Sequence, residues 1–214
     1  MKLLYVTKEK KYKSDFLQLL MSTNTEVTHI SSNELCLIDI NDYHYFVFDG
    51  TGTNEGLKFY APEQEIAEKI ISTGKHVFSI FCPFLWSVSC GAPTSTRYDR
   101  PIFTGNSTID GLEECDILDE QSNLRLHCYA SKNATNPILY YKHLPKGFYK
   151  ISEAKKNVSN DEAALWLESE NLLYCTFCIS NFAKAAFSPR KTWYSLFKFI
   201  IKWLCGETVC ESNY

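Results

Sequence analysis

The stretch that decides the fold runs from Tyr45 to Cys82 and reads YFVFDGTGTNEGLKFYAPEQEIAEKIISTGKHVFSIFC. It predicts an apolar strand over residues 43–48, a glycine-containing loop, an amphipathic helix over residues 62–72 and a second apolar strand over residues 76–81. A strand, a crossover helix and a following strand usually form parallel neighbours with a right-handed connection. We therefore expect both strands to be neighbours or near neighbours in one central sheet. The loop should then lie at its carboxyl edge, where α/β proteins build their sites.

The residues on the amino-terminal side extend this pattern. Residues 2–7 and 26–31 read as strands, and residues 11–22 between them carry apolar side chains at helical spacing. Residues 35–40 are apolar and short, which fits either a strand or a packed loop. The order strand, helix, strand, strand, helix, strand predicts an α/β fold with a flavodoxin-like, doubly wound, mostly parallel sheet.

The middle of the chain changes character. Between residues 83 and 159, helical periodicity is weak, and Pro, Gly, Asn and Ser punctuate short apolar runs. Residues 124–130, 137–143 and 147–152 read as strands. We expect a loop-rich β elaboration that forms an antiparallel extension. Because no repeat or linker interrupts the sequence, we expect a single domain over residues 1–214.

The carboxyl-terminal part returns to strong patterns. Residues 163–168 and 172–179 predict a hairpin, and residues 188–206 predict a helix that is opened by Ser-Pro and closed by glycine. Lysines and aromatic side chains on this helix also suit a membrane surface. We expect it to pack on the sheet instead, because it follows a buried strand by a short loop. The side chains expected to face the sheet are Trp193, Leu196, Phe197, Ile200, Ile201 and Leu204.

Composition narrows the class of protein. The chain has 214 residues and a formal net charge of −3, so it carries no basic field for general nucleic-acid binding. The amino terminus lacks the apolar core of a signal peptide, and no apolar run has the length of a membrane span. Nine cysteines are scattered without a framework spacing. We therefore expect reduced thiols and a cytoplasmic protein.

Several local motifs occur in a characteristic order. The motifs are DGTGT at 49–53, GKHVFSIF at 74–81, ALW at 164–166, FSP at 187–189 and WLCG at 203–206. Together they resemble the class I glutamine-amidotransferase-like superfamily, nearest its trehalose-utilisation-type branch. The resemblance covers roughly residues 2–82 and 160–206, and it implies that superfamily's α/β scaffold.

The resemblance also implies where a catalytic site should be. In that superfamily, the first loop supplies an oxyanion-hole amide, and the next strand ends at a Gly-x-Cys-x-Gly nucleophile elbow. A His-x-Glu pair follows the last strand. Here the nucleophile position falls on Phe81, one residue before Cys82, and residues 178–182 at the histidine position read CISNF. The resemblance therefore implies a preserved scaffold with a degenerate catalytic site.

Two candidate sites follow. Cys82 is the candidate catalytic nucleophile. Its alternative role is that of a small buried apolar side chain. Pro83 speaks against catalysis, because proline lacks the backbone N–H that normally follows a nucleophile and serves the oxyanion hole. The loop after the first central strand is the candidate ligand-binding site, because its glycines allow backbone amides to face a ligand; the alternative is a simple strand-ending turn. Its candidate ligand-binding residues are Asp49, Gly50, Thr51, Gly52, Thr53 and Asn54.

A Cys-x-x-Cys pair at Cys175 and Cys178 suggests a metal or redox site. Both residues fall within a predicted strand, where side chains three apart point to opposite faces. A metal site of this kind needs a second ligand pair, and the sequence offers none at matching spacing. We therefore expect two buried thiols, no metal and no cofactor.

These observations predict a non-catalytic amidotransferase-like module that binds a small polar ligand or a protein partner. An enzyme or binding protein of trehalose-utilisation type, acting on a carbohydrate-like ligand, remains as an alternative. A cysteine-dependent glutaminase or hydrolase is the third hypothesis. The sequence leaves the oligomeric state open.

Overall fold

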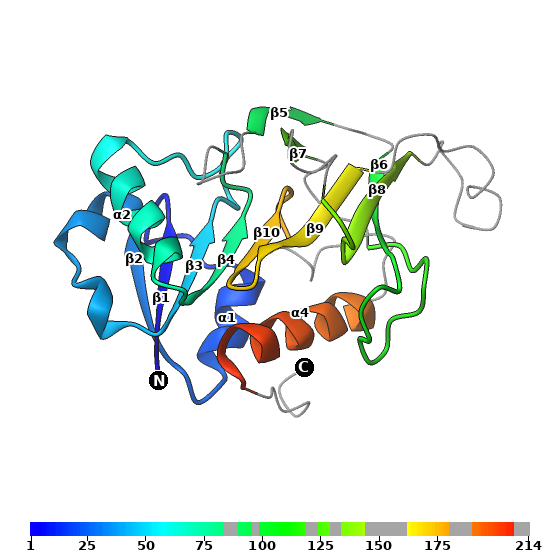
Figure 1. Cartoon of the computed structure of the whole chain (residues 1–214), viewed down its shortest axis with the longest axis horizontal. Helices are drawn as coiled ribbons and strands as arrows, with labels where there is room; N and C mark the ends of the chain where they lie inside the picture. The colour runs from blue at the N-terminus through cyan, green and yellow to red at the C-terminus, as the bar shows by residue number, and fades with distance from the viewer. Residues whose placement is uncertain are drawn as a thin grey trace.

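The computed structural model describes residues 1–83, 90–95, 99–118, 124–128, 134–143, 162–179 and 190–207. Its elements, in chain order, are β1 (Lys2–Thr7), α1 (Asp15–Met21), β2 (Glu26–Ser31), η1 (Ser32–Leu37), η2 (Ile40–Asp42), β3 (Tyr45–Asp49), α2 (Ala61–Ser72), β4 (His76–Ile80), β5 (Cys90–Ser95), β6 (Asp99–Phe103), β7 (Leu124–Cys128), β8 (Leu139–His143), β9 (Glu162–Ser169), β10 (Leu172–Cys175) and α4 (Arg190–Cys205). Figure 1 shows the parallel strands at one end of the molecule and the antiparallel strands at the other.

The main sheet has eight strands in the order β2-β1-β3-β4-β10-β9-β8-β6. The strands from β2 to β10 run parallel, and β9, β8 and β6 continue the sheet in antiparallel pairs. A separate antiparallel ribbon pairs β5 with β7. The mixed α/β class and the antiparallel extension expected from the sequence are therefore confirmed. The strand predicted over residues 147–152 lies outside the described residues.

The prediction for the two central strands is confirmed. β3 and β4 are parallel neighbours, with Phe46 opposite Val77, and α2 connects them. Pro62 stands in the first turn of α2, where a missing N–H costs no helical hydrogen bond. The residues that α2 buries are Ala67, Ile70 and Ile71.

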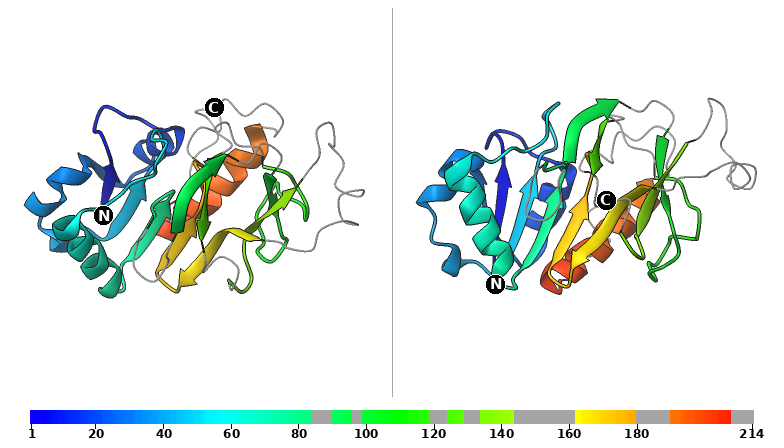
Figure 2. Two further views of the ribbon diagram at one scale, coloured as in Figure 1. Left: turned by 90° about the horizontal axis from the view of Figure 1, so that it is seen from above. Right: turned by 45° about the horizontal axis from the view of Figure 1, so that its top comes forward.

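The helices cover both faces of the sheet. The views in Figure 2 place α2 on one face and both α1 and α4 on the other. Phe16 of α1 lies at the centre of the second layer, with its ring 5.4 Å from that of Phe78 on β4 and 5.0 Å from that of Phe197 on α4. Burying a large apolar side chain contributes roughly 1.5–3 kcal/mol, so these contacts join α1, the sheet and α4 into one core.

The carboxyl-terminal helix packs as the sequence predicts. All six side chains expected to face the sheet are buried in α4. The end of the helix is fixed by His76, whose Nδ1 lies 2.9 Å from the carbonyl oxygen of Trp203 and whose ring stacks on the indole at 4.7 Å. Within the part of the chain that the structure describes, no helix is both long and apolar enough to cross a bilayer.

Three local predictions were wrong in detail. The first helix begins at Asp15 rather than Lys11, because the Ser14 hydroxyl accepts a hydrogen bond from the amide of Leu17 and caps the helix there. Residues 35–40 do not form a strand: residues 35–37 and residue 40 belong to two short 3-10 helices, and the segment packs on the core through Leu35 and Ile40, which are buried. β10 ends at Cys175, so Cys178 lies beyond the strand.

Candidate functional site

The site lies at the carboxyl ends of β1 and β3. The chain leaves β1 toward β2 on one side and leaves β3 toward β4 on the other, so the two loops diverge at this point of the sheet. Such a divergence opens a crevice that α/β proteins use for ligands. A pocket of about 540 Å³ lies between the two loops. Its lining residues are Thr7, Lys8, Glu9, Lys11, Tyr12, Thr51, Gly52, Thr53, Asn54 and Glu55.

Asp49 anchors the loop that the sequence singled out. Its carboxylate is fully buried, and Oδ2 accepts a 2.5 Å hydrogen bond from the hydroxyl of Tyr5 on β1. Oδ1 accepts a 2.8 Å bond from the amide of Thr51. The Tyr5 hydroxyl also lies 2.9 Å from that of Ser14, the cap of α1. Through these hydrogen bonds, Asp49 links the loop after β3 to Tyr5 on β1 and to the start of α1. Both carboxylate oxygens are thus bonded within the protein rather than facing a ligand.

Gly50 allows this loop to pack closely against the end of β4. Its amide donates to the carbonyl of Ile80 at 2.8 Å. A Cβ at Gly50 would lie 2.1 Å from the carbonyl oxygen of Phe81 and 2.5 Å from the amide of Leu57, so only glycine fits. The amides of Gly50 and Thr51 are thus both used within the protein. The resemblance implies an oxyanion-hole amide in this loop, and neither of these two is available for it.

Phe81 occupies the position at which the resemblance places the nucleophile. Its backbone has a φ of +53°, a conformation that is an outlier for a bulky side chain. Its amide donates to the carbonyl of Cys175, and its carbonyl accepts from the amide of Leu57. A sharp turn of this kind after a strand presents the nucleophile in elbow enzymes. Here the turn carries a fully buried phenyl ring, which has no nucleophilic atom.

Cys82 lies inside the core beside this turn. Its thiol is fully buried and lies within hydrogen-bond distance of two carbonyl oxygens, those of Ile80 at 3.3 Å and Phe48 at 3.4 Å. Burial raises the pKa of the Cys82 thiol far above its ordinary value, and the Asp49 carboxylate raises it further. A thiol that stays protonated at neutral pH is a poor nucleophile. The geometry therefore fits the alternative role, a small buried side chain.

The second wall of the pocket is the β1–α1 loop, which the sequence did not single out. A Cβ at Gly52 would lie 2.6 Å from the ring of Tyr12, so that ring packs directly on the glycine of the opposite loop. Each carboxylate of the lining has a lysine partner. Glu9 pairs with Lys11 at 2.7 Å, and Glu55 pairs with Lys58 at 3.1 Å. The only sequence signal for this wall was its position after a predicted strand.

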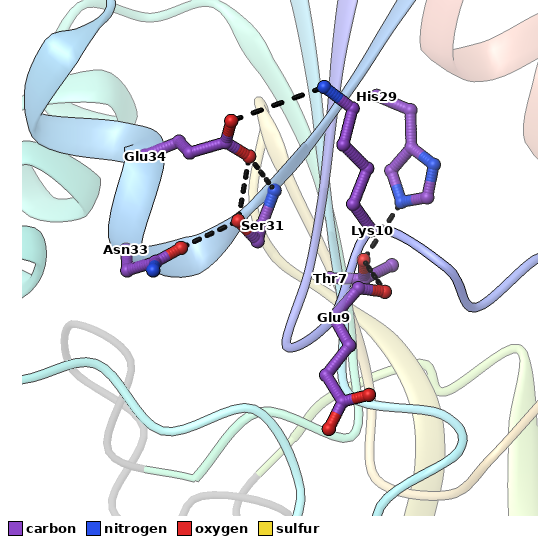
Figure 3. Close-up of polar contacts among 7 residues, drawn as sticks. All are labelled: Thr7, Glu9, Lys10, His29, Ser31, Asn33 and Glu34. Carbon is purple, nitrogen blue, oxygen red and sulfur yellow. Dashed lines mark hydrogen bonds and ion pairs between the residues drawn. The ribbon is translucent and has the colours of Figure 1, made fainter.

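Two of the three threonine hydroxyls in the pocket have partners within the protein. Thr7 donates to the carbonyl of Glu9 at 3.0 Å and accepts from Nε2 of His29 at 2.8 Å, as Figure 3 shows. Thr53 donates to the carbonyl of Gly50 at 3.0 Å. Thr51 Oγ1 is buried without a hydrogen-bond partner, and Thr51 is only 3% exposed. Because an unpaired buried hydroxyl is costly, this atom points to a missing partner.

A polar cluster borders the pocket behind Thr7 (Figure 3). Burial lowers the pKa of His29, and the nearby ammonium group of Lys10 lowers it further. Lys10 lies 4.0 Å from Glu34, which also accepts hydrogen bonds from the amide and the hydroxyl of Ser31. This arrangement keeps His29 neutral, with the hydrogen on Nε2, and directs Lys10 toward Glu34.

The Cys-x-x-Cys pair lies at and just beyond the end of β10. Cys175 and Cys178 are buried free thiols. Across the described ranges, no three His, Cys, Asp or Glu side chains gather as a metal site would require. The thiols therefore contribute to the core around the end of β10.

Comparison with known proteins adds little. No protein-family model and no curated protein sequence matches the chain. Among solved structures, the chain is similar to one described as "mmIFT52 N-terminal domain", with 10% sequence identity, coverage of 95% of this chain and 96% of that chain, and a TM-score of 0.44. At this level of similarity, the match carries no functional conclusion.

Proposed function

We propose that this chain is a non-catalytic member of the class I amidotransferase-like superfamily, with a flavodoxin-like, doubly wound core, and that it binds a small polar ligand in the pocket between the β1–α1 and β3–α2 loops. The observation that carries the proposal is the buried, unpartnered hydroxyl of Thr51 on the pocket wall. A ligand atom in the pocket can supply the missing partner, since a buried hydroxyl without one costs stability.

The absence of catalysis rests on the turn after β4. The apolar ring of Phe81 fills the nucleophile position, and the neighbouring thiol of Cys82 is buried and protonated. The amides of Gly50 and Thr51 are occupied by Ile80 and Asp49. A turn without a nucleophile, beside amides that are already bonded, supports binding rather than covalent chemistry.

The lining supports a small polar ligand. It combines hydroxyl, ammonium, carboxylate and amide groups with the ring of Tyr12, and ligand sites use a few such convergent polar groups to fix orientation. The pocket volume lies within the ordinary range of small-molecule sites. A protein partner that inserts a polar side chain would use the same groups.

The proposal places the protein in the cytoplasm. It is supported by the free thiols among the described cysteines, since thiols persist in reducing compartments. It also includes no role in nucleic-acid binding, because the net charge of −3 provides no basic field.

A ligand-observed NMR screen tests this proposal. The panel contains glucose, trehalose, glutamine, gluconate and glucose 6-phosphate, each measured with the native protein and with Thr51→Val. We expect at least one compound to bind the native protein and to bind Thr51→Val more weakly. No binding, or binding that Thr51→Val leaves unchanged, would contradict the pocket assignment.

The same samples test the absence of catalysis. Each mixture is incubated overnight and analysed for ammonia release from glutamine and for chemical change of the sugars, and we expect none. Hydrolysis of trehalose would favour the trehalose-utilisation-type enzyme. Ammonia release that Cys82→Ala abolishes would favour the glutaminase.

A further inference from the structure

The two lysines that line the pocket, Lys8 and Lys11, differ in their ion pairs. Lys8 and Lys11 line the pocket together with Glu9 and Glu55, and Lys58 lies outside the lining but pairs with Glu55. Lys11 and Lys58 are each paired with one of the carboxylates, at 2.7 Å and 3.1 Å. Within the described part of the chain, Lys8 forms no ion pair. One positive charge on the pocket wall is therefore left without a direct partner.

Lys8 lines the same pocket as the carboxyl groups of Glu9 and Glu55. Lys11 is the main cause of the lowered pKa of Glu9, and Lys58 is the main cause of the lowered pKa of Glu55. The charge of Lys8 lowers the pKa of both Glu9 and Glu55 further, in keeping with its place in the same lining.

A second donor in the same pocket also lacks a partner. Thr51 Oγ1 is buried and unpartnered, while Thr7 and Thr53 donate their hydroxyl hydrogens to backbone carbonyls. A hydroxyl and an ammonium group together can each donate a hydrogen bond to oxygen atoms of one anion. Such charge-assisted hydrogen bonds are shorter and stronger than neutral ones.

We infer that the ligand of this pocket carries an oxyanion, a carboxylate or a phosphate group, held by the hydroxyl of Thr51 and the ammonium group of Lys8. This inference rests on the proposed ligand-binding function and adds the chemical class of the ligand. The paired carboxylates of Glu9 and Glu55, and the amide of Asn54, remain available for hydroxyl groups on the rest of the ligand. The pocket therefore suits a small polyhydroxylated acid or phosphate ester.

Three compounds that share a polyol chain test the inference: glucose, gluconate and glucose 6-phosphate. Each is titrated into the ¹⁵N-labelled full chain at about 0.15 M sodium chloride, which screens non-specific attraction. The amides of Gly52, Thr53 and Asn54, on the pocket wall, report binding. We expect gluconate, glucose 6-phosphate or both to shift these signals with a dissociation constant at least tenfold lower than that of glucose. The stronger of the two identifies the carboxylate or the phosphate source.

Substitutions distinguish binding at this site from non-specific electrostatic attraction to the protein. Lys8→Met and Thr51→Val should each weaken binding of the anion about tenfold or more, because each removes a hydrogen bond to a charged group. Thr51→Ser keeps the hydroxyl and should bind within about threefold of the native protein. Lys10→Met is the matched control: Lys10 lies on the same loop but faces Glu34, so binding should be unchanged.

Three results overturn the inference. One is equal binding of glucose and the two anions, which leaves the binding function intact and removes the oxyanion. Another is equal weakening by Lys8→Met and Lys10→Met, which shows diffuse attraction. The third is the lack of any shift with all three compounds, in which case the wider screen decides the binding function separately.

Discussion

Two buried threonines in the pocket should respond in opposite directions to the same substitution. Thr51 and Thr7 are 3% and 1% exposed, and both line the pocket. Thr51 Oγ1 has no hydrogen-bond partner, whereas Thr7 Oγ1 bonds to Glu9 and His29 at 3.0 and 2.8 Å. Replacement by valine exchanges the hydroxyl for a methyl group of similar size. The sign of the effect therefore depends on what the hydroxyl was bonded to.

The magnitudes follow from this difference. Leaving a buried polar group unpaired costs about 1–3 kcal/mol, so Thr51→Val removes an existing penalty and should raise the free energy of unfolding by about 1 kcal/mol. Thr7→Val removes two bonds and leaves His29 without its partner, so it should lower the free energy of unfolding by about 1–3 kcal/mol. In a domain of this size, 1 kcal/mol corresponds to a change of about 2–4 °C in Tm.

The assay is urea unfolding of the ligand-free protein, followed by tryptophan fluorescence and repeated by calorimetry. The two probes check that unfolding is a two-state process. If Thr51→Val lowers stability as much as Thr7→Val does, the Thr51 hydroxyl has a partner within the protein. In that case the hydroxyl does not need a ligand atom as its hydrogen-bond partner.

Three further predictions concern Gly50, Cys82 and His29. Gly50→Ala should lower the free energy of unfolding by about 3–5 kcal/mol, because its Cβ would lie 2.1 Å from a backbone oxygen and would break two buried hydrogen bonds. Gly74→Ala, where a Cβ meets nothing within 4 Å, should cost only about 1–2 kcal/mol from its φ of +75°; equal losses in urea unfolding would contradict the close packing. Iodoacetamide should modify the exposed Cys36 in the folded protein and the buried Cys82 only after unfolding, as peptide mass spectrometry can measure; rapid labelling of Cys82 would contradict its burial. Burial lowers the pKa of His29 in the folded state, so the stability that neutral His29 provides is present above its unfolded pKa, near 6.5, and decreases as the pH falls toward the folded pKa. Between pH 8 and pH 5, the urea midpoint should therefore fall less in His29→Gln than in the native protein. Parallel curves for the two proteins would contradict this expectation.

The local patterns of the sequence predict the parallel core well. Residues 2–7 and 26–31 form strands as predicted, and β3 and β4 pair across α2. These elements have a strong periodicity that no tertiary contact opposes. The same holds for α4, where the helical spacing of large apolar side chains defines one buried stripe.

The errors arise where side chains bond to nearby backbone. Ser14 caps α1 and delays its start, and Glu34 bonds to the amide and the hydroxyl of Ser31, which begins a 3-10 helix where apolar content alone suggested a strand or a loop. Such hydrogen bonds compete with regular structure, and hydrophobic periodicity does not reveal them.

Half of the candidate site was visible in the sequence. The glycines and polar residues after β3 indicated the loop with Thr51, and the structure places this loop on the pocket wall. The opposite wall, with Lys8 and Tyr12, depends on which strand lies beside β3. That neighbour is β1, a pairing between segments about forty residues apart that hydrophobic periodicity alone does not specify. The lack of a partner for Thr51 also appears only in three dimensions.

The most direct test of the binding function is a crystal structure of the protein grown with the tightest-binding compound of the screening panel. We expect the ligand to lie between the β1–α1 and β3–α2 loops, with oxygen atoms within hydrogen-bond distance of Thr51 Oγ1 and of Lys8 Nζ, and with Cys82 unmodified. A ligand bound elsewhere on the protein, or attached covalently to Cys82, would contradict it.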